Sequence, residues 1–203
     1  GKYVYDDGKI HSSFSNLVTS TGRLQSEDPN VQNFPYREHP EIRRVIKAPP
    51  GHWMVPVDFG QLEARVIAMA SLDPTLCEEM CTQYDIHGDW TDQLGKAFKP
   101  SLLRTPEARA HLREYMKNRW TFPLFFGSTL ESVAQDLSEV FGVPIASKAD
   151  LRAWATQLRP YYDAFWGKYR GVLRWQQHTE TEFHRSGFVS TLTGFRRHAP
   201  LTH

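Results

Sequence analysis

The chain has 203 residues, of which 40% are hydrophobic and 13% aromatic, so it can bury the core of one or two domains. This composition excludes a disordered chain, and the apolar runs are too short to cross a bilayer. The formal net charge is +1, and only downstream of residue 112 do bases outnumber acids, a weak indication of a polyanionic partner. The two cysteines, Cys77 and Cys81, have no histidine cluster beside them, and no signal peptide opens the sequence. We therefore expect reduced thiols, no membrane partner and a cytoplasmic location.

The first 35 residues are rich in Ser, Thr, Asn and Asp, which predicts short strands and turns. Residues 45–48 and 53–57 predict two more strands, joined by the Pro-Pro-Gly turn signal at residues 49–51. Helical spacing of apolar residues begins after residue 60, and helices are predicted at residues 75–83, 89–97, 106–127, 129–141, 147–158 and 161–185. We therefore expect an α+β fold, with a small strand-bearing unit followed by a mostly helical one.

Residues 55–65 carry the strongest chemical signal and read Val-Pro-Val-Asp-Phe-Gly-Gln-Leu-Glu-Ala-Arg. This pattern predicts an apolar strand with Asp58 at its end, directly before a helix. A carboxylate in that place is held by the backbone and lies at an open edge, which suits a hard divalent cation. The alternative is that Asp58 only caps the helix that follows.

The same segment resembles motif A of family A DNA polymerases, Asp-Tyr-Ser-Gln-Ile-Glu-Leu-Arg. Asp58, Gln61, Glu63 and Arg65 stand in matching places. Phe59 and Gly60 depart from the Tyr and Ser of the pattern. The resemblance implies that Asp58 binds two Mg²⁺ ions, that the Phe59 carbonyl is a ligand of one, and that Gln61 lies beside the nucleotide. Glu63 is then the steric gate that excludes ribonucleotides by a clash with the 2′-hydroxyl.

Residues 19–33 resemble a second block of this family, Thr-Gly-Arg-Leu-Ser-Ser-x-Asp-Pro-Asn-Leu-Gln-Asn-Ile-Pro. The resemblance implies that four side chains lie along the DNA duplex beside the primer terminus: Arg23, Asn30, Gln32 and Asn33. Arginine and amide groups can contact phosphates and minor-groove acceptors without choosing a sequence, as a copying enzyme requires. The alternative is a turn-rich loop in which the Asn residues are structural.

Two shorter segments agree with the same family. Residues 84–87, Tyr-Asp-Ile-His, resemble the Asp-Ile-His that precedes the fingers, which implies that His87 hydrogen-bonds the triphosphate. Residues 187–197 resemble Gly-Tyr-Val-x-Thr-Leu-x-Gly-Arg-Arg-Arg, so that Arg196 and Arg197 contact the template or the fingers surface. A structural ion-pair role for these arginines is the alternative.

Residues 113–127 resemble motif B, Arg-x-x-x-Lys-x-x-x-Phe/Tyr-x-x-x-Tyr-Gly, with one residue too many before Phe122. Phosphoryl transfer needs cations on one helix face to balance the triphosphate, and Arg113 and Lys117 keep the spacing that places them together. In a regular α-helix the extra residue turns Lys117 by about 100° relative to Phe122. We therefore predict a π-bulge or kink at residues 118–121, beside Pro123. The alternative is a regular helix in which Arg119 reaches the phosphates.

The aromatic residues of motif B have implied roles as well. Phe122 packs on the sugar, and because a phenylalanine offers no hydroxyl there, the resemblance implies discrimination against dideoxynucleotides. Phe126 replaces the usual Tyr and is implied to stack near the templating base. Together with the departures in motif A, this suggests a divergent, viral branch of the family.

The family continues with motif C, His-Asp-Glu, which does not occur in this sequence. Two-metal phosphoryl transfer requires cations about 3.5–4 Å apart held by carboxylates, and Asp58 alone cannot supply that charge. We therefore expect a DNA-directed DNA polymerase that is inactive without a companion polypeptide or segment carrying motif C and the thumb. Its other partners are primer–template DNA and a deoxynucleoside triphosphate (dNTP).

The expected domains are residues 1–71, a partial palm with an antiparallel sheet, and residues 72–203, a helical fingers subdomain with motif B. A non-catalytic DNA-binding relic of a polymerase is the alternative function.

Overall fold

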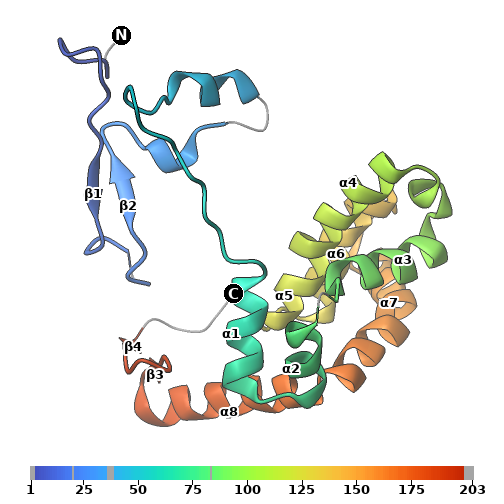
Figure 1. Cartoon of the computed structure of the whole chain (residues 1–203). Coiled ribbons are helices and arrows are strands. Elements are labelled where there is room, and N and C mark those ends of the chain that lie inside the picture. Colours follow the sequence, from blue (N-terminus) through green and yellow to red (C-terminus); the bar gives the residue numbers. More distant parts are fainter. Residues whose placement is uncertain (1–2, 20, 36–38, 83, 199–203) are drawn as a thin grey trace.

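The computed structural model describes residues 3–19, 21–35, 39–82 and 84–198 (Figure 1). The first part of the chain contains strands β1 (Ser13–Ser15) and β2 (Gln25–Glu27) and the short 3-10 helices η1 (Val31–Asn33) and η2 (Pro40–Val45). The helical part that follows contains α1 (Leu62–Ser71), α2 (Pro74–Cys81), α3 (Ile86–Phe98), η3 (Pro100–Leu103), α4 (Pro106–Met116), η4 (Lys117–Thr121), α5 (Phe122–Phe125), α6 (Leu130–Phe141), α7 (Lys148–Lys168) and α8 (Arg170–Ser186). A hairpin of β3 (Val189–Ser190) and β4 (Arg196–Arg197) comes last.

Both strand pairs are antiparallel. Phe14 of β1 lies opposite Ser26 of β2, and Val189 of β3 lies opposite Arg197 of β4. The predicted α+β class is therefore confirmed, with short antiparallel strands and a mostly helical body. Among the described residues, no helix is both long and apolar enough to span a membrane.

The two strands predicted at residues 45–48 and 53–57 are wrong. Val45 ends η2, and residues 52–59 run without a ladder partner from η2 towards α1 (Figure 1). A strand is stable only when its backbone groups pair with a neighbour, and Pro56 lacks the N–H that a ladder uses. The apolar side chains of this segment stay in solvent, with Trp53 92% and Val57 87% exposed. The apolar run at residues 53–57 therefore has no neighbouring strand among the described residues, and the ladder that it needs does not form.

Several helices begin where the sequence provides a capping side chain. Thr105, Thr129 and Ser147 each accept a hydrogen bond from the backbone N–H three residues later, at the start of α4, α6 and α7. The Asp150 carboxylate accepts a hydrogen bond from the Ser147 hydroxyl, which supports the start of α7 from the other side. These local bonds satisfy backbone donors that have no partner inside the helix, and so they determine where each helix begins.

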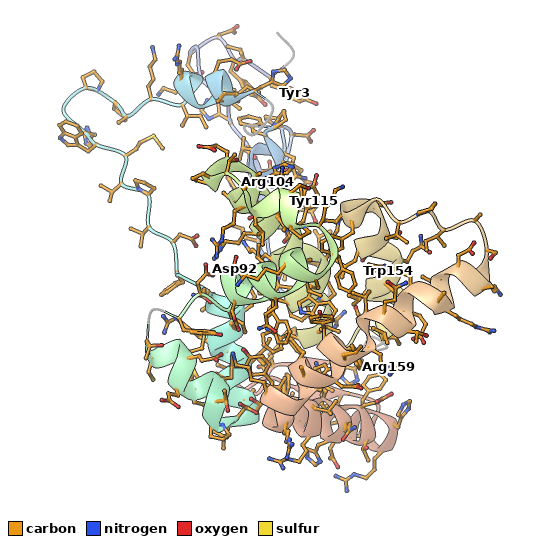
Figure 2. The ribbon with its side chains drawn as sticks, turned by 90° about the vertical axis from the view of Figure 1, so that its right-hand side faces the viewer. Tyr3, Asp92, Arg104, Tyr115, Trp154 and Arg159 are labelled. Atoms are coloured by element: carbon orange, nitrogen blue, oxygen red, sulfur yellow. The ribbon has the colours of Figure 1, made fainter. Side chains whose placement is uncertain are left out.

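The core of the helical part is aromatic. The rings of Trp90 in α3 and Trp120 in η4 lie 5.8 Å apart, and both pack against Phe165 of α7, at 5.3 and 6.1 Å. All three side chains are at most 1% exposed. On the other side of the core, Trp154 of α7 points towards α6 and donates a 3.0 Å hydrogen bond to the Ala134 carbonyl (Figure 2). Ring contacts thus join α3, η4 and α7, and this hydrogen bond joins α7 to α6.

The break between the last two long helices lies later than predicted. The sequence pattern placed it at residues 159–160, but α7 continues through Pro160 to Lys168, and the chain turns at Tyr169. The Tyr169 hydroxyl donates a 2.8 Å hydrogen bond to Glu79 of α2, and the Lys168 ammonium lies 2.8 Å from the same carboxylate. A proline removes only one helix hydrogen bond, whereas these tertiary contacts determine where the chain turns.

One buried carboxylate joins two helix starts. Asp73 is 1% exposed, and it accepts hydrogen bonds from the backbone N–H of Leu76 in α2 at 2.9 Å and of Gly171 in α8 at 2.6 Å. A Cβ at Gly171 would lie 2.8 Å from the Asp73 Cα, so only glycine permits this approach. The negative charge also suits the positive ends of two helix dipoles.

Replacing Asp73 with alanine should therefore destabilise the fold by about 2–3 kcal/mol, because two buried backbone donors lose their acceptor. Urea unfolding followed by circular dichroism measures this loss. Asp163→Ala, at an exposed position of α7, is the matched control and should change the free energy of unfolding by less than about 0.5 kcal/mol. Equal effects of the two substitutions would show that Asp73 does not join the helices.

Candidate active site

The helix of motif B is interrupted by one π-helical turn. Residues Lys117–Thr121 form η4 between α4 and α5, and the Phe122 N–H donates to the Lys117 carbonyl, five residues back. Pro123 has no N–H to offer the Arg119 carbonyl, so the regular α-helical bond at this point cannot form. The predicted bulge at residues 118–121 is therefore confirmed, and it absorbs the additional residue of this motif B.

The bulge brings the cationic and aromatic residues of motif B together. The Lys117 ammonium lies 5.7 Å from the centre of the Phe122 ring. The Phe122 ring stacks on Phe126 at 5.9 Å and meets the edge of the His87 ring at 5.1 Å. The charge of Arg113 in α4 acts on His87 as well. Residues from α3, α4, η4 and α5, with Phe126 directly after α5, thus form one group, which we call the motif B cluster: His87, Arg113, Lys117, Phe122 and Phe126.

Arg119, the cation of the alternative register, is occupied elsewhere. Its Nη1 donates to Glu139 at 2.6 Å and to the Asp136 carbonyl at 3.1 Å, both in α6. Its guanidinium also lies 5.6 Å from the ring of Tyr115. The geometry therefore favours Lys117 over Arg119 as the cation that accompanies Phe122.

His87 is the buried member of the cluster, with 2% exposure in the first turn of α3. Burial, and after it the positive charge of Arg113, lowers its pKa from the usual 6.5 to about 4. In the described part of the chain, no group is placed to hydrogen-bond its Nδ1. A neutral imidazole with a free nitrogen is therefore ready to bind a polar group that enters the cluster.

Arg113 does not stand free in the cluster, because Asp85 forms a bidentate ion pair with it. The Asp85 carboxylate accepts from Arg113 Nε at 2.8 Å and from Nη2 at 2.6 Å. This pair lowers the pKa of Asp85 and raises that of Arg113. No role was predicted for Asp85 from the sequence, although an aspartate directly before the helix that carries His87 could have indicated one.

Motif A lies in the unpaired segment and in α1. Asp58 and Phe59 are exposed, and within the described residues the Asp58 carboxylate makes no hydrogen bond or ion pair. Glu63, at the start of α1, is also exposed, whereas the side-chain oxygen of Gln61 is buried without a partner among the described residues. Across the same part of the chain, no group of three His, Cys, Asp or Glu side chains is placed to hold a metal ion.

Arg65 holds this segment against the helical body. Its Nε donates to the Gly60 carbonyl at 2.9 Å and its Nη1 to the Met80 carbonyl of α2 at 2.7 Å. The sequence showed Arg65 only as a matching letter of motif A. The structure shows what it does, which is to attach the end of the Asp58 segment to α2.

The four residues that the sequence predicts to contact DNA in the first block differ in availability. Asn30 caps η1 and accepts a hydrogen bond from Ser26, while the Gln32 amide bonds the Ser26 N–H at 2.9 Å and the Leu24 carbonyl at 3.1 Å. These bonds agree with the structural alternative for Asn30 and Gln32. Arg23 and Asn33 are exposed.

The two arginines of the last block lie in β4. Arg196 is exposed, and its guanidinium lies 4.5 Å from the ring of Phe188. Arg197 is half-buried, and its Nε is buried without a partner in the described residues. Both arginines therefore belong to the small hairpin after α8, which lies far from the motif B cluster along the sequence.

The lowered pKa of His87 predicts that the free energy of unfolding depends on pH. Since the unfolded chain takes up this proton near pH 6.5 and the folded chain near pH 4, the wild type should lose stability as pH falls through this window. The loss should reach about 3 kcal/mol relative to His87→Gln, which cannot ionise. Unfolding free energies of both proteins between pH 7.5 and 4 measure it, and parallel pH profiles would show that His87 titrates normally.

Comparison with known proteins gives the same family throughout the chain. The model of "DNA polymerase family A" matches residues 2–203. DNA polymerase I of Pseudomonas aeruginosa is 29% identical over 200 residues, which cover 97% of this chain and 19% of that protein. DNA polymerase I of Chloroflexus aurantiacus is 32% identical over 192 residues, covering 94% of this chain and 18% of that protein. The chain therefore spans about a fifth of the length of these relatives.

A solved structure agrees with the sequence comparison. The polymerase domain of Pol1 from M. smegmatis, in complex with DNA primer–template and dNTP, superposes with a TM-score of 0.69 and 28% identity. The match covers 98% of this chain and 32% of that one. With the motif B cluster formed and a family model matched from end to end, the chain belongs to DNA polymerase family A.

Proposed function

We propose that this chain supplies the nucleotide-binding half of a DNA-directed DNA polymerase. In the reaction, the primer 3′-hydroxyl attacks the α-phosphate of a dNTP, and pyrophosphate leaves. The observation that carries the proposal is the π-bulge, because it places Lys117 beside Phe122 despite the additional residue in motif B. A helix that was merely structural would have no need to preserve this juxtaposition.

Three residues of the motif B cluster would bind the triphosphate. Arg113 and Lys117 stand one turn apart and offer positive charge, while the neutral His87 offers a hydrogen bond. Catalysis of phosphoryl transfer consists mainly of positioning and of offsetting negative charge. The cluster can do both, since its cations are held by a helix and its histidine is buried.

The sugar and base would lie against the aromatic part of the cluster. Phe122 and Phe126 stack at 5.9 Å and form a continuous apolar surface. Phe126 is 47% exposed, so a templating base can reach its ring. Glu63 and Gln61, at the start of α1, are the proposed contacts of the sugar from the opposite side.

The metal site would be completed by another part of the polymerase. Asp58 and the Phe59 carbonyl supply hard oxygen ligands that fit Mg²⁺, which usually takes one or two carboxylates with water and phosphate oxygens. When bound, Mg²⁺ offsets the charge that builds on the transferred phosphate. Asp58 is exposed and has no partner among the described residues, so a second carboxylate can approach it from a companion segment carrying motif C.

The same companion would cover the exposed segment before α1. Trp53, Val55 and Val57 are between 76% and 92% exposed, and their backbone has no ladder partner. We therefore assign residues 1–71 to a partial palm and residues 72–203 to the fingers. Primer–template DNA would run past Arg23 and Asn33 in the palm and Arg196 and Arg197 after α8.

A non-catalytic relic of a polymerase is the second candidate. It is favoured by the internal hydrogen bonds of Asn30 and Gln32, which leave these amides less free for DNA. Such a relic needs no nucleotide, whereas the polymerase must bind dNTP with Mg²⁺. Magnesium-dependent nucleotide binding therefore distinguishes the two functions.

One lysine and one arginine in η4, Lys117 and Arg119, test the bulge assignment. Lys117→Ala should weaken binding of Mg²⁺–dATP about tenfold, because a charged partner of the phosphates is lost. Arg119→Ala should change the dissociation constant less than about twofold, since Arg119 contacts α6 instead. Isothermal titration calorimetry measures both, and the reverse order of effects would assign the phosphates to Arg119.

Primer extension tests the incomplete metal site. Adding a segment with motif C and the thumb of a family A polymerase should produce extension of a labelled primer by the mixture, because the second carboxylate is then present. Asp58→Asn in the same mixture should slow extension by about a thousandfold, since the metal site loses its own carboxylate. Persistent extension with Asp58→Asn would remove Asp58 from the metal site.

A further inference from the structure

Helices α3 and α4 are joined by two ion pairs with the same geometry. Asp85 accepts from Arg113 Nε and Nη2 at 2.8 and 2.6 Å, and Asp92 accepts from Arg109 Nε and Nη2 at 2.8 and 2.9 Å. Figure 2 labels Asp92, which lies on α3 beside α4. All four side chains are between 33% and 45% exposed, so the two pairs resemble each other in solvent access as well.

Only one of these two pairs includes a residue of the motif B cluster, which is Arg113. Arg113 is close enough to His87 to lower its pKa, and it stands one turn before Lys117. Arg109 lies a further turn away, about 6 Å along the helix axis. The chain therefore contains a pair at the proposed triphosphate site and a similar pair beside it that can act as a control.

The ion pair leaves one edge of the Arg113 guanidinium without a hydrogen-bond partner among the described residues. Asp85 takes the edge formed by Nε and Nη2. The guanidinium has a second edge, formed by Nη1 and the other N–H of Nη2, which can bind a phosphate in the same bidentate way. Because the first edge is held, the direction of the second edge is set before any ligand arrives.

Gly88 leaves room for Asp85 in its observed position. A Cβ on Gly88 would run into the Asp85 carboxylate, so the glycine allows this carboxylate to lie against the first turn of α3. The pKa of Asp85 is lowered, chiefly by its hydrogen bonds with Arg113, and the carboxylate therefore stays ionised in neutral solution.

We propose that Asp85 is a positioning residue, which holds Arg113 with its Nη1–Nη2 edge directed at the triphosphate. This inference rests on the proposed nucleotide-binding function. Asp85 does not touch the nucleotide and acts through Arg113 alone. Its negative charge repels a triphosphate, so orientation and repulsion oppose each other, and the proposal states that orientation dominates.

The test compares Asp85→Asn with Asp92→Asn in the complete 203-residue chain. Isothermal titration calorimetry with Mg²⁺ and dATP should show a dissociation constant about tenfold higher for Asp85→Asn, the size expected when the partner that orients a binding group is removed. Asp92→Asn should stay within about twofold of the wild type. Binding of the monophosphate dAMP should be similar in all three proteins if Arg113 binds the β- and γ-phosphates, which dAMP lacks.

A second substitution separates positioning from a general structural effect. Arg113→Lys removes the planar fork that Asp85 orients while it keeps the charge. In this background, Asp85→Asn should cause no further loss of dATP affinity. A full tenfold loss in the lysine background, or an equal loss with Asp92→Asn, would overturn the proposal.

The outcomes also distinguish this inference from the proposed function. If the wild type does not bind Mg²⁺–dATP, the nucleotide-binding function itself fails. If the wild type binds and Asp85→Asn binds equally or more tightly, repulsion dominates and only the positioning role is refuted. Circular dichroism of each variant excludes unfolding as the cause of a lost signal.

Discussion

The arrangement of the motif B cluster depends on one backbone hydrogen bond, from the Phe122 N–H to the Lys117 carbonyl. Pro123 has no N–H for the regular hydrogen bond to the Arg119 carbonyl, so the chain accommodates an additional residue as a π-turn. Without that turn, Lys117 would point about 100° away from Phe122. With it, Trp120 enters the core, Arg119 turns towards α6, and Lys117 faces the aromatic pair.

The electrostatics of the motif B cluster follow from where each charge is held. His87 is neutral because it is buried beside Arg113, and Arg113 is fixed because Asp85 pairs with one edge of its guanidinium. The cluster therefore keeps positive charge in a defined direction before a ligand binds. Such preorganisation is the way a protein offsets the charge of a triphosphate without paying for rearrangement during the reaction.

The two parts of the chain differ in how completely they are packed. The helices carry an aromatic core around Trp90 and Phe165, and Asp73 joins α2 to α8 through buried hydrogen bonds. The segment before α1 keeps its apolar side chains in solvent and is attached to the body through Arg65. The segment that presents Asp58 is therefore the part of the chain that most needs a partner.

The sequence by itself determined the family, the α+β class and the bulge in motif B, because each depends on neighbouring residues or on a local motif. Pro123 and the additional residue lie within one turn of each other, so their conflict is visible in the sequence. Only the tertiary structure decided that α7 passes through Pro160, that residues 53–57 form no strand, and that Asp85 holds Arg113. These features depend on contacts between residues far apart in the chain, and local propensity does not contain that information.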